Sequence, residues 1–96
     1  MRVMLRARMD TQMSNKLIKS GELQKVMEKM LQDLKPEAAY FGPSDGGRSC
    51  TFVFDMQDSW RLPSIAEPLL EELGAKIEIQ PVMNVEDMQK GLAALK

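Results

Sequence analysis

The stretch "YFGPSDGGRSCTFVF", residues 40–54, decides the fold, because a glycine-rich turn in it separates two runs of strand-forming residues. An Asp-Gly pair between such runs is a strong hairpin signal, since glycine adopts positive φ without strain. A phosphate-binding loop needs a helix directly after its glycines, whereas the residues after Gly47 form a strand pattern. The stretch therefore predicts a hairpin between strands over residues 38–41 and 48–56, and no phosphate site.

Two further strands and several helices are expected on either side of this hairpin. Alternation of apolar and polar residues predicts strands over residues 2–9 and 76–82. Apolar residues spaced three or four apart predict a helix that ends at residues 35–36, after a shorter helical piece that stops at residues 20–21. A last helix follows Asn84, with Asp87 at the capping-box position.

Another helix is expected between residues 58 and 74. Asp58 or Ser59 can cap its start, Pro63 suits its first turn and Gly74 suits its end. Pro68 predicts a kink or a division into two pieces. We expect six residues to form its buried side: Trp60, Leu62, Ile65, Leu69, Leu70 and Leu73.

The element order is β-α-β-β-α-β-α, which predicts one α+β domain over residues 1–96. Right-handed crossovers and one hairpin favour a four-stranded antiparallel sheet in the order 4-1-3-2, with both main helices on one face. This is the ferredoxin-like βαββαβ architecture, here with an extra C-terminal helix. A domain of this size buries only a modest core, so pairing with a second copy would help it.

Composition excludes several classes of protein. The net charge is −1, from 13 basic and 14 acidic residues, which argues against a general nucleic-acid binder. The N-terminal residues match no signal peptide, and no stretch matches a membrane span. The single cysteine cannot form an intrachain disulfide. We therefore expect a cytoplasmic protein with no membrane partner and no cofactor.

The side of the sheet away from the helices carries the candidate site. The helices should cover the more apolar parity of each strand, which includes Phe52 and Phe54. The other face then presents arginines and acids, and the ligand-binding candidates on it are Arg6, Arg8, Tyr40, Asp55 and Glu78. In one interpretation Arg6 or Arg8 pairs with Asp55 or Glu78 across strands, contributing about 0.2–1 kcal/mol per pair. In the other, a second subunit covers the face and the arginines line a cavity that binds a small anionic or aromatic ligand.

Known catalytic and RNA-binding patterns fit poorly. The chain has no histidine, which removes the imidazole-dependent triads and the common zinc-protease motif. We expect no metal site, and no catalytic residue can be assigned. The run "RSCTFVFD", residues 48–55, is faintly similar to the aromatic strand of RNA-recognition domains. That alignment would expose Phe52, place Cys50 at the first aromatic position and drive Asp55 into the core.

Two segments carry a broader resemblance. "VMLRARMD" (3–10) and "AKIEIQPVMNVEDM" (75–88) resemble the first and last strands of small dimeric α/β-barrel proteins. The named relatives are the muconolactone isomerase-like and antibiotic-biosynthesis monooxygenase-like proteins, together with an uncharacterised bacterial family of this length. The resemblance implies a homodimer in which two sheets face each other. It assigns no activity, because this fold serves many functions.

Three functions are therefore consistent with the sequence. The first is a homodimeric small-molecule-binding protein with an arginine-lined pocket. The second is a cofactor-independent isomerase or monooxygenase that uses the same cleft. The third is a structural or interaction module without a ligand.

Overall fold

The computed structural model describes residues 1–95 as four strands, four α-helices and one short 3₁₀ helix, η1. The elements are β1 (Arg2–Arg8), α1 (Thr11–Ser20), α2 (Glu22–Leu34), β2 (Ala38–Ser44), β3 (Gly47–Asp55), η1 (Ser59–Arg61), α3 (Leu62–Leu73), β4 (Lys76–Pro81) and α4 (Val85–Ala93). The element order matches the expected one, with η1 as an addition.

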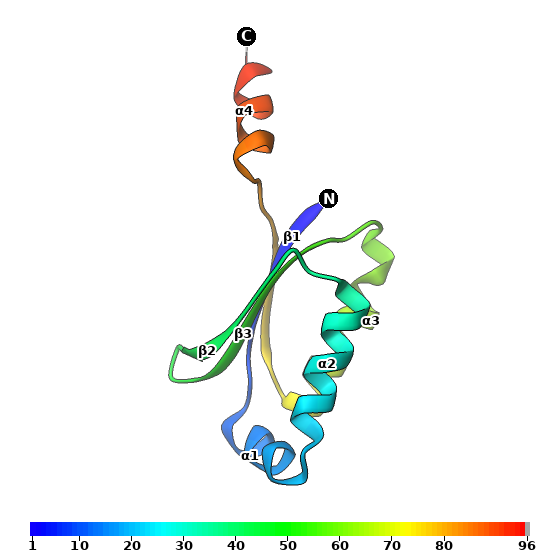
Figure 1. Ribbon diagram of the computed structural model, residues 1–96, viewed down its shortest axis with the longest axis vertical. Helices are drawn as coiled ribbons and strands as arrows, with labels where there is room; N and C mark the ends of the chain where they lie inside the picture. Colours follow the sequence, from blue (N-terminus) through cyan, green and yellow to red (C-terminus); the bar gives the residue numbers. More distant parts are fainter. Residues whose placement is uncertain (96) are drawn as a thin grey trace.

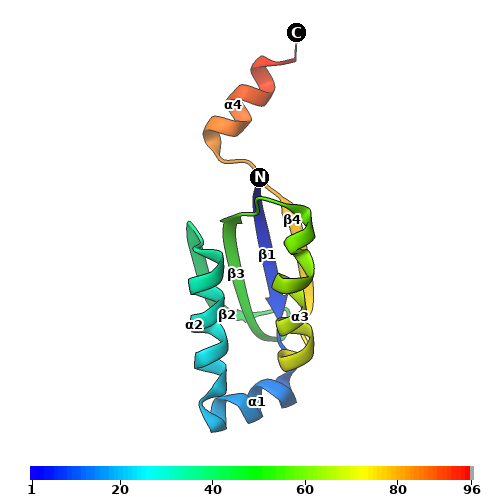
Figure 2. The ribbon, with the colours of Figure 1, turned by 90° about the vertical axis from the view of Figure 1, so that its right-hand side faces the viewer.

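The four strands form one antiparallel sheet in the order β2-β3-β1-β4, which confirms the predicted order. Helices α2 and α3 lie side by side on one face of the sheet, and the opposite face is open (Figure 1, Figure 2). In the register, Leu5 of β1 stands opposite Phe52 of β3 on one side and Ile79 of β4 on the other. The fold is thus two-layered, with one covered sheet face and one open sheet face.

The hairpin is tighter than the sequence suggests. Ser44 pairs with Gly47, and the two residues between them, Asp45 and Gly46, have positive φ of 53° and 78°. Two positive φ values are typical of the type I′ turn, which matches the twist of the flanking strands. Strand β2 therefore continues past Phe41 as far as Ser44, and it tolerates Pro43 because β2 is an edge strand.

The core lies between the covered face and the two main helices. From β1, β3 and the residue directly after each of them it takes Val3, Leu5, Ala7, Met9, Cys50, Phe52, Phe54 and Met56, all buried. Met30 and Leu34 of α2, Ile65, Leu69 and Leu73 of α3, and Ala75 before β4 complete it. The edge of Phe52 also meets Phe41, with ring centroids 5.7 Å apart. The prediction that Phe52 and Phe54 lie beneath the helices is confirmed.

Most predicted helix ends are confirmed by the backbone. Gly21 ends α1 with φ 80°, Lys35 ends α2 with φ 45°, and Gly74 ends α3 with φ 54°. Gly74 has a second reason to be glycine, because an added Cβ would stand 2.7 Å from the sulfur of Met13. At the start of α4, Asn84 and Asp87 form both hydrogen bonds of the capping box.

The stretch from residue 58 to residue 73, which forms η1 and α3, departs from expectation in which side chains are buried and in how it is capped. Trp60 is 75% exposed, and Leu62 and Leu70 are exposed as well, so the predicted buried side of this helix is half wrong. The backbone turns through η1 first, which moves Trp60 out of the helical stripe. Asp58 precedes η1 but makes no side-chain capping bond. Pro68 lies within α3 without dividing it.

Helix α4 stands apart from the rest of the molecule. It continues beyond the end of β4 and projects away from both layers (Figure 1). The molecule therefore measures 55 × 27 × 17 Å, with a radius of gyration of 15.1 Å. A compact domain of this length has a radius of gyration of about 12–13 Å.

Candidate functional site: a basic hollow on the open sheet face

The open face carries a hollow of about 370 Å³ at the hairpin end of the sheet. We call it the open-face hollow; its walls come from β1, β3, β4 and the hairpin, and its lining residues are Arg6, Ala7, Arg8, Ser44, Asp45, Ser49, Cys50, Thr51, Lys76, Ile77 and Glu78. Its size falls within the roughly 300–1,000 Å³ typical of small-molecule sites. Most of its polar groups are hydroxyls and charged side chains.

The register explains why these side chains meet. Arg6 stands between Thr51 and Glu78, and Arg8 stands between Ser49 and Lys76, so two cross-strand rows form the floor. Side chains of one parity share a face of the sheet. Three cations therefore gather with the carboxylates of Glu78 and Asp45, which leaves one positive charge in excess.

Arg8 is held in place by the hairpin. Its Nε donates a hydrogen bond to the carbonyl oxygen of Asp45 at 2.7 Å. Its guanidinium lies over Gly47, where a Cβ would stand 3.2 Å from Nε. The two glycines of the hairpin thus have different roles: Gly46 supplies the turn, and Gly47 leaves room for Arg8.

Arg6 makes no salt bridge and no side-chain hydrogen bond within residues 1–95, although Glu78 stands opposite it in β4. The salt bridges of this part of the chain join the Met1 amine to Asp55 at 2.7 Å, and Arg2 to both Glu37 and Asp87. The predicted pairing of Arg6 or Arg8 with Asp55 or Glu78 is not formed. Arg2 pairs instead, and its hydrogen bond to Glu37 is the main cause that raises the pKa of its guanidinium.

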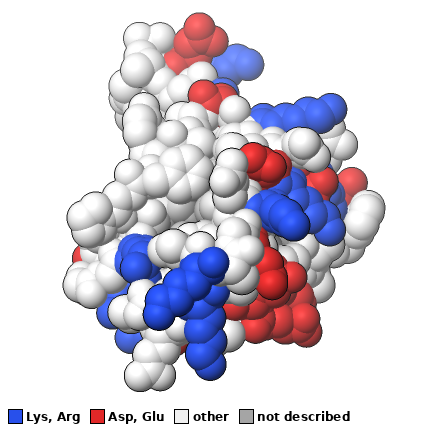
Figure 3. Space-filling model, turned by 60° about the horizontal axis from the view of Figure 1, so that its bottom comes forward, with Lys and Arg blue, Asp and Glu red and all other residues white. Residues whose placement is uncertain are grey.

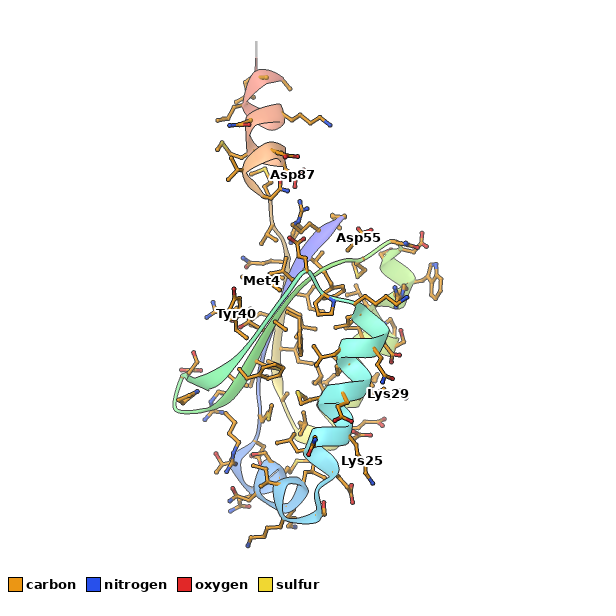
Figure 4. All side chains as sticks on the ribbon, viewed as in Figure 1. Met4, Lys25, Lys29, Tyr40, Asp55 and Asp87 are labelled. Atoms are coloured by element: carbon orange, nitrogen blue, oxygen red, sulfur yellow. The ribbon has the colours of Figure 1, made fainter. Side chains whose placement is uncertain are left out.

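The structure brings together three of the five predicted site residues. Arg6, Arg8 and Glu78 line the hollow. Tyr40 is on the same face and in the Arg6 row, beyond Thr51, but does not line the hollow. Asp55 is opposite Arg2, four residues along β1 from Arg6, or about 13 Å away. Figure 4 shows Met4 and Tyr40 on the side of the sheet away from α2, and Asp55 towards the end from which α4 projects.

Sequence reasoning missed Lys76, Ser49 and Thr51 as lining residues. Lys76 has the same parity as Glu78 in β4, and its register places it opposite Arg8. Parity alone could have identified it, because it begins the predicted strand. The contribution of Asp45 could not have been found in this way, since it depends on how the hairpin curls towards Arg8.

Cys50 is no nucleophile candidate. Although Cys50 is among the residues that border the open-face hollow, it is only 1% exposed and belongs to the core on the covered face, and burial raises the pKa of its thiol to about 11. A thiol with that pKa is almost wholly protonated at neutral pH, and the thiolate is the reactive form. Residues 1–95 also contain no cluster of three or more metal-ligating side chains.

The structure also contradicts the alignment of β3 with the aromatic strand of RNA-recognition domains. It requires Phe52 in solvent, whereas Phe52 is fully buried. The end of the molecule formed by α1 also shows basic and acidic side chains in neighbouring groups, so the surface in that view has mixed sign (Figure 3).

A second hollow, of about 250 Å³, lies between α2 and α3 on the outer surface. Val26, Met30, Ile65 and Pro68 give it apolar walls, and charged side chains surround them. No helix within residues 1–95 combines the length and apolar character needed to cross a membrane.

Comparison with known proteins identifies the fold and nothing more specific. No protein-family model and no curated protein sequence matches this chain. Among solved structures, the chain is similar to the de novo designed protein Ferredog-Diesel, with a TM-score of 0.50 and 8% sequence identity. The match covers 84% of this chain and 85% of the designed protein. At that identity the likeness concerns the fold alone, and it supports the ferredoxin-like architecture derived above.

Proposed function

We propose that this protein is a homodimeric small-molecule-binding domain whose ligand is a small anion held in the open-face hollow. The observation that carries the proposal is Arg6, a guanidinium on the wall of a 370 Å³ hollow with no salt-bridge partner in residues 1–95. Carboxylate and phosphate groups match the planar donor set of arginine and form charge-assisted hydrogen bonds with it.

The neighbours of Arg6 favour one charged group attached to a small uncharged body. Arg8 and Lys76 add positive charge, while Ser49 and Thr51 offer hydroxyls on the floor. Glu78 and Asp45 offset much of that charge, so a multiply charged anion would meet repulsion on one side of the hollow. A monoanion of benzoate size fits both the volume and the charge.

A second copy is part of the proposal, because one wall of the hollow is missing in a single chain. The open face supplies a floor and a rim, and a facing sheet would exclude water and strengthen the electrostatic contacts. The resemblance to muconolactone isomerase-like and monooxygenase-like dimeric α/β barrels supports this arrangement. A bacterial origin and a cytoplasmic location remain predictions from the sequence.

The test is a calorimetric titration with benzoate, with the dianion phenyl phosphate as the control for charge number and neutral benzamide as the control for shape without charge. We expect benzoate to bind, phenyl phosphate to bind more weakly, and benzamide to bind at least tenfold more weakly than benzoate. Arg6→Gln should weaken the binding of the anion at least tenfold, because it removes a guanidinium of the hollow that makes no bond within residues 1–95. Lys25→Gln is the matched control, since it removes an exposed cation on α2 (Figure 4). Equal losses in the two variants, or equal binding of benzamide, would contradict an arginine-centred anion site.

A further inference from the structure

Helix α4 has an apolar stripe that its own chain leaves uncovered. Val85 and Leu92 of α4 are 65% and 60% exposed, and Met88 is 38% exposed; Leu95, just beyond the end of the helix, is 78% exposed. None of them belongs to the hydrophobic core. Exposed apolar side chains gathered on one face of a helix mark an interaction surface.

The helix is nevertheless firmly attached. The capping box of Asn84 and Asp87 fixes its first turn. Asp87 also accepts a hydrogen bond from the Arg2 guanidinium, and the Val82 amide donates to the carbonyl oxygen of Arg2 at 3.1 Å. Only three residues, 82–84, separate β4 from α4. These contacts hold α4 pointing away from its own sheet, as Figure 1 shows.

The open face has an uncovered apolar region of its own, at the end opposite the open-face hollow. The register places Ala38, Val53 and Met4 in one row across β2, β3 and β1. Tyr40 follows on the same face of β2 and is 70% exposed. Asp87 and the start of α4 are near this end of the sheet, as Figure 4 shows.

We propose that α4 of each chain docks on this apolar region of a second copy, so that two chains exchange their C-terminal helices. The inference rests on the homodimer of the proposed function and names the element that forms it. Such a contact is reciprocal: the same helix and the same sheet region are used by both subunits of a two-fold dimer. The open-face hollow is at the other end of the sheet, so the docked helix does not fill it.

Size and charge both fit this occupant. The nine residues of α4 span about 14 Å, and the outer strands of a four-stranded sheet are also about 14 Å apart. Arg2 and Asp87 pair with each other within one chain, so neither is counted here. The other charged strand residues of the open face are Arg6, Arg8 and Lys76 against Asp55 and Glu78, an excess of one positive charge, and it suits a helix with Glu86 in its first turn. A lipid surface fits less well, because interfacial helices are rich in Lys and Arg.

The first experiment measures the mass of the protein by sedimentation equilibrium. The wild-type chain of 10.9 kDa should sediment as a dimer. Leu92→Glu should weaken the dimer at least about a hundredfold, because it places a carboxylate in the apolar contact. Ala94→Glu is the matched control: it adds the same charge near the same helix end, on the opposite side of α4, and it should leave the dimer intact. A dimer unaffected by Leu92→Glu would overturn the exchange of α4, while the proposed homodimer would stand.

A wild-type monomer would overturn both the exchange and the homodimer. Anion binding by that monomer would still support the anion site in the open-face hollow. The anion site and the exchange of α4 can therefore be contradicted independently. Folding of Leu92→Glu is checked by its circular dichroism spectrum. The spectrum should match that of the wild type, because Leu92 contributes nothing to the core.

The second experiment locates the docked helix. A spin label on Ala94→Cys is placed in one subunit, and ¹⁵N signals are observed in an unlabelled partner; native Cys50 is buried and does not compete for the label. Broadening should be strongest in the strands around Met4, Tyr40 and Val53. Broadening centred on Ser64 and Pro68 would place α4 in the groove between α2 and α3 and would overturn the proposed docking site.

Discussion

Thr51 and Phe52 are neighbours in β3, yet they belong to different environments. Phe52 is fully buried in the core with side chains of α2 and α3, whereas Thr51 lines the open-face hollow. The same contrast runs along β1, where Leu5 is fully buried and Arg6 is exposed. In each of these strands, alternate residues pack in the core, and the residues between them form the open surface of the sheet.

Arginines on the two faces of the sheet also differ in their hydrogen bonds. Arg48 has the parity of the covered face, and its Nη1 donates to Ser14 Oγ at 2.7 Å and to Asn15 Oδ1 at 2.8 Å. It thereby joins β3 to α1, and Ser14 is the one buried polar residue of the described chain. Arg6 on the open face makes no comparable bond within residues 1–95. Arg48 on the covered face is thus bonded by its own chain, whereas Arg6 on the open face is not.

The largest effect on stability should come from a substitution on the covered face of the sheet. Phe52→Ala removes a fully buried ring, and we expect it to lower the free energy of unfolding by about 3–5 kcal/mol. Thr51→Val keeps the branched shape at the adjacent position and should change stability by less than about 0.5 kcal/mol. Urea unfolding followed by circular dichroism measures both. Similar losses of unfolding free energy in the two variants would mean that the two faces of β3 contribute equally to stability, which would contradict the burial described above.

The next largest effect on stability is expected when Arg48 and Arg6 are replaced in turn. Arg48→Ala should lower the free energy of unfolding by about 2 kcal/mol, because it removes charge-assisted hydrogen bonds to a buried hydroxyl and its neighbour. Arg6→Ala should change it by less than about 0.5 kcal/mol while weakening anion binding. Thermal unfolding at low protein concentration separates these effects from dimer formation. A larger loss of stability in Arg6→Ala would indicate that Arg6 is structural.

The features that sequence reasoning identified are local or periodic. Alternation in residues 2–9 and 48–56 assigned Phe52 and Arg6 to opposite faces, because successive strand residues point in opposite directions. The Asp45-Gly46 turn and the Asn84 capping box depend on neighbouring residues only, and both are present. These features were sufficient for the element order and the sheet order.

The features that were missed depend on contacts between distant segments. The bond from Arg48 to Ser14 joins residues 34 positions apart, and no periodicity indicates it. Trp60 is apolar and close to a helical stripe, but η1 rotates it into solvent. The stripe of α4 was recognised from its spacing, yet spacing shows which residues share a face and not whether the chain has a surface to cover it.

The smallest predicted effect concerns pH and again contrasts the two faces. Burial raises the pKa of Cys50 to about 11 from 9.0, so above pH 9 the unfolded chain releases a proton that the folded chain retains. The contribution of this thiol to stability is therefore present in full well below pH 9 and declines as the pH rises, by about 1.4 kcal/mol at pH 10. The measurement is the difference in unfolding free energy between the wild type and Cys50→Ala at pH 7 and at pH 10, which removes the titration of other groups. The advantage of the wild type should shrink by that amount, and Thr51→Ala, one residue away on the open face, should show no such change. A constant difference between wild type and Cys50→Ala would show that the thiol titrates as freely in the folded protein as in the unfolded chain, and the covered face would then be less sealed than its packing indicates.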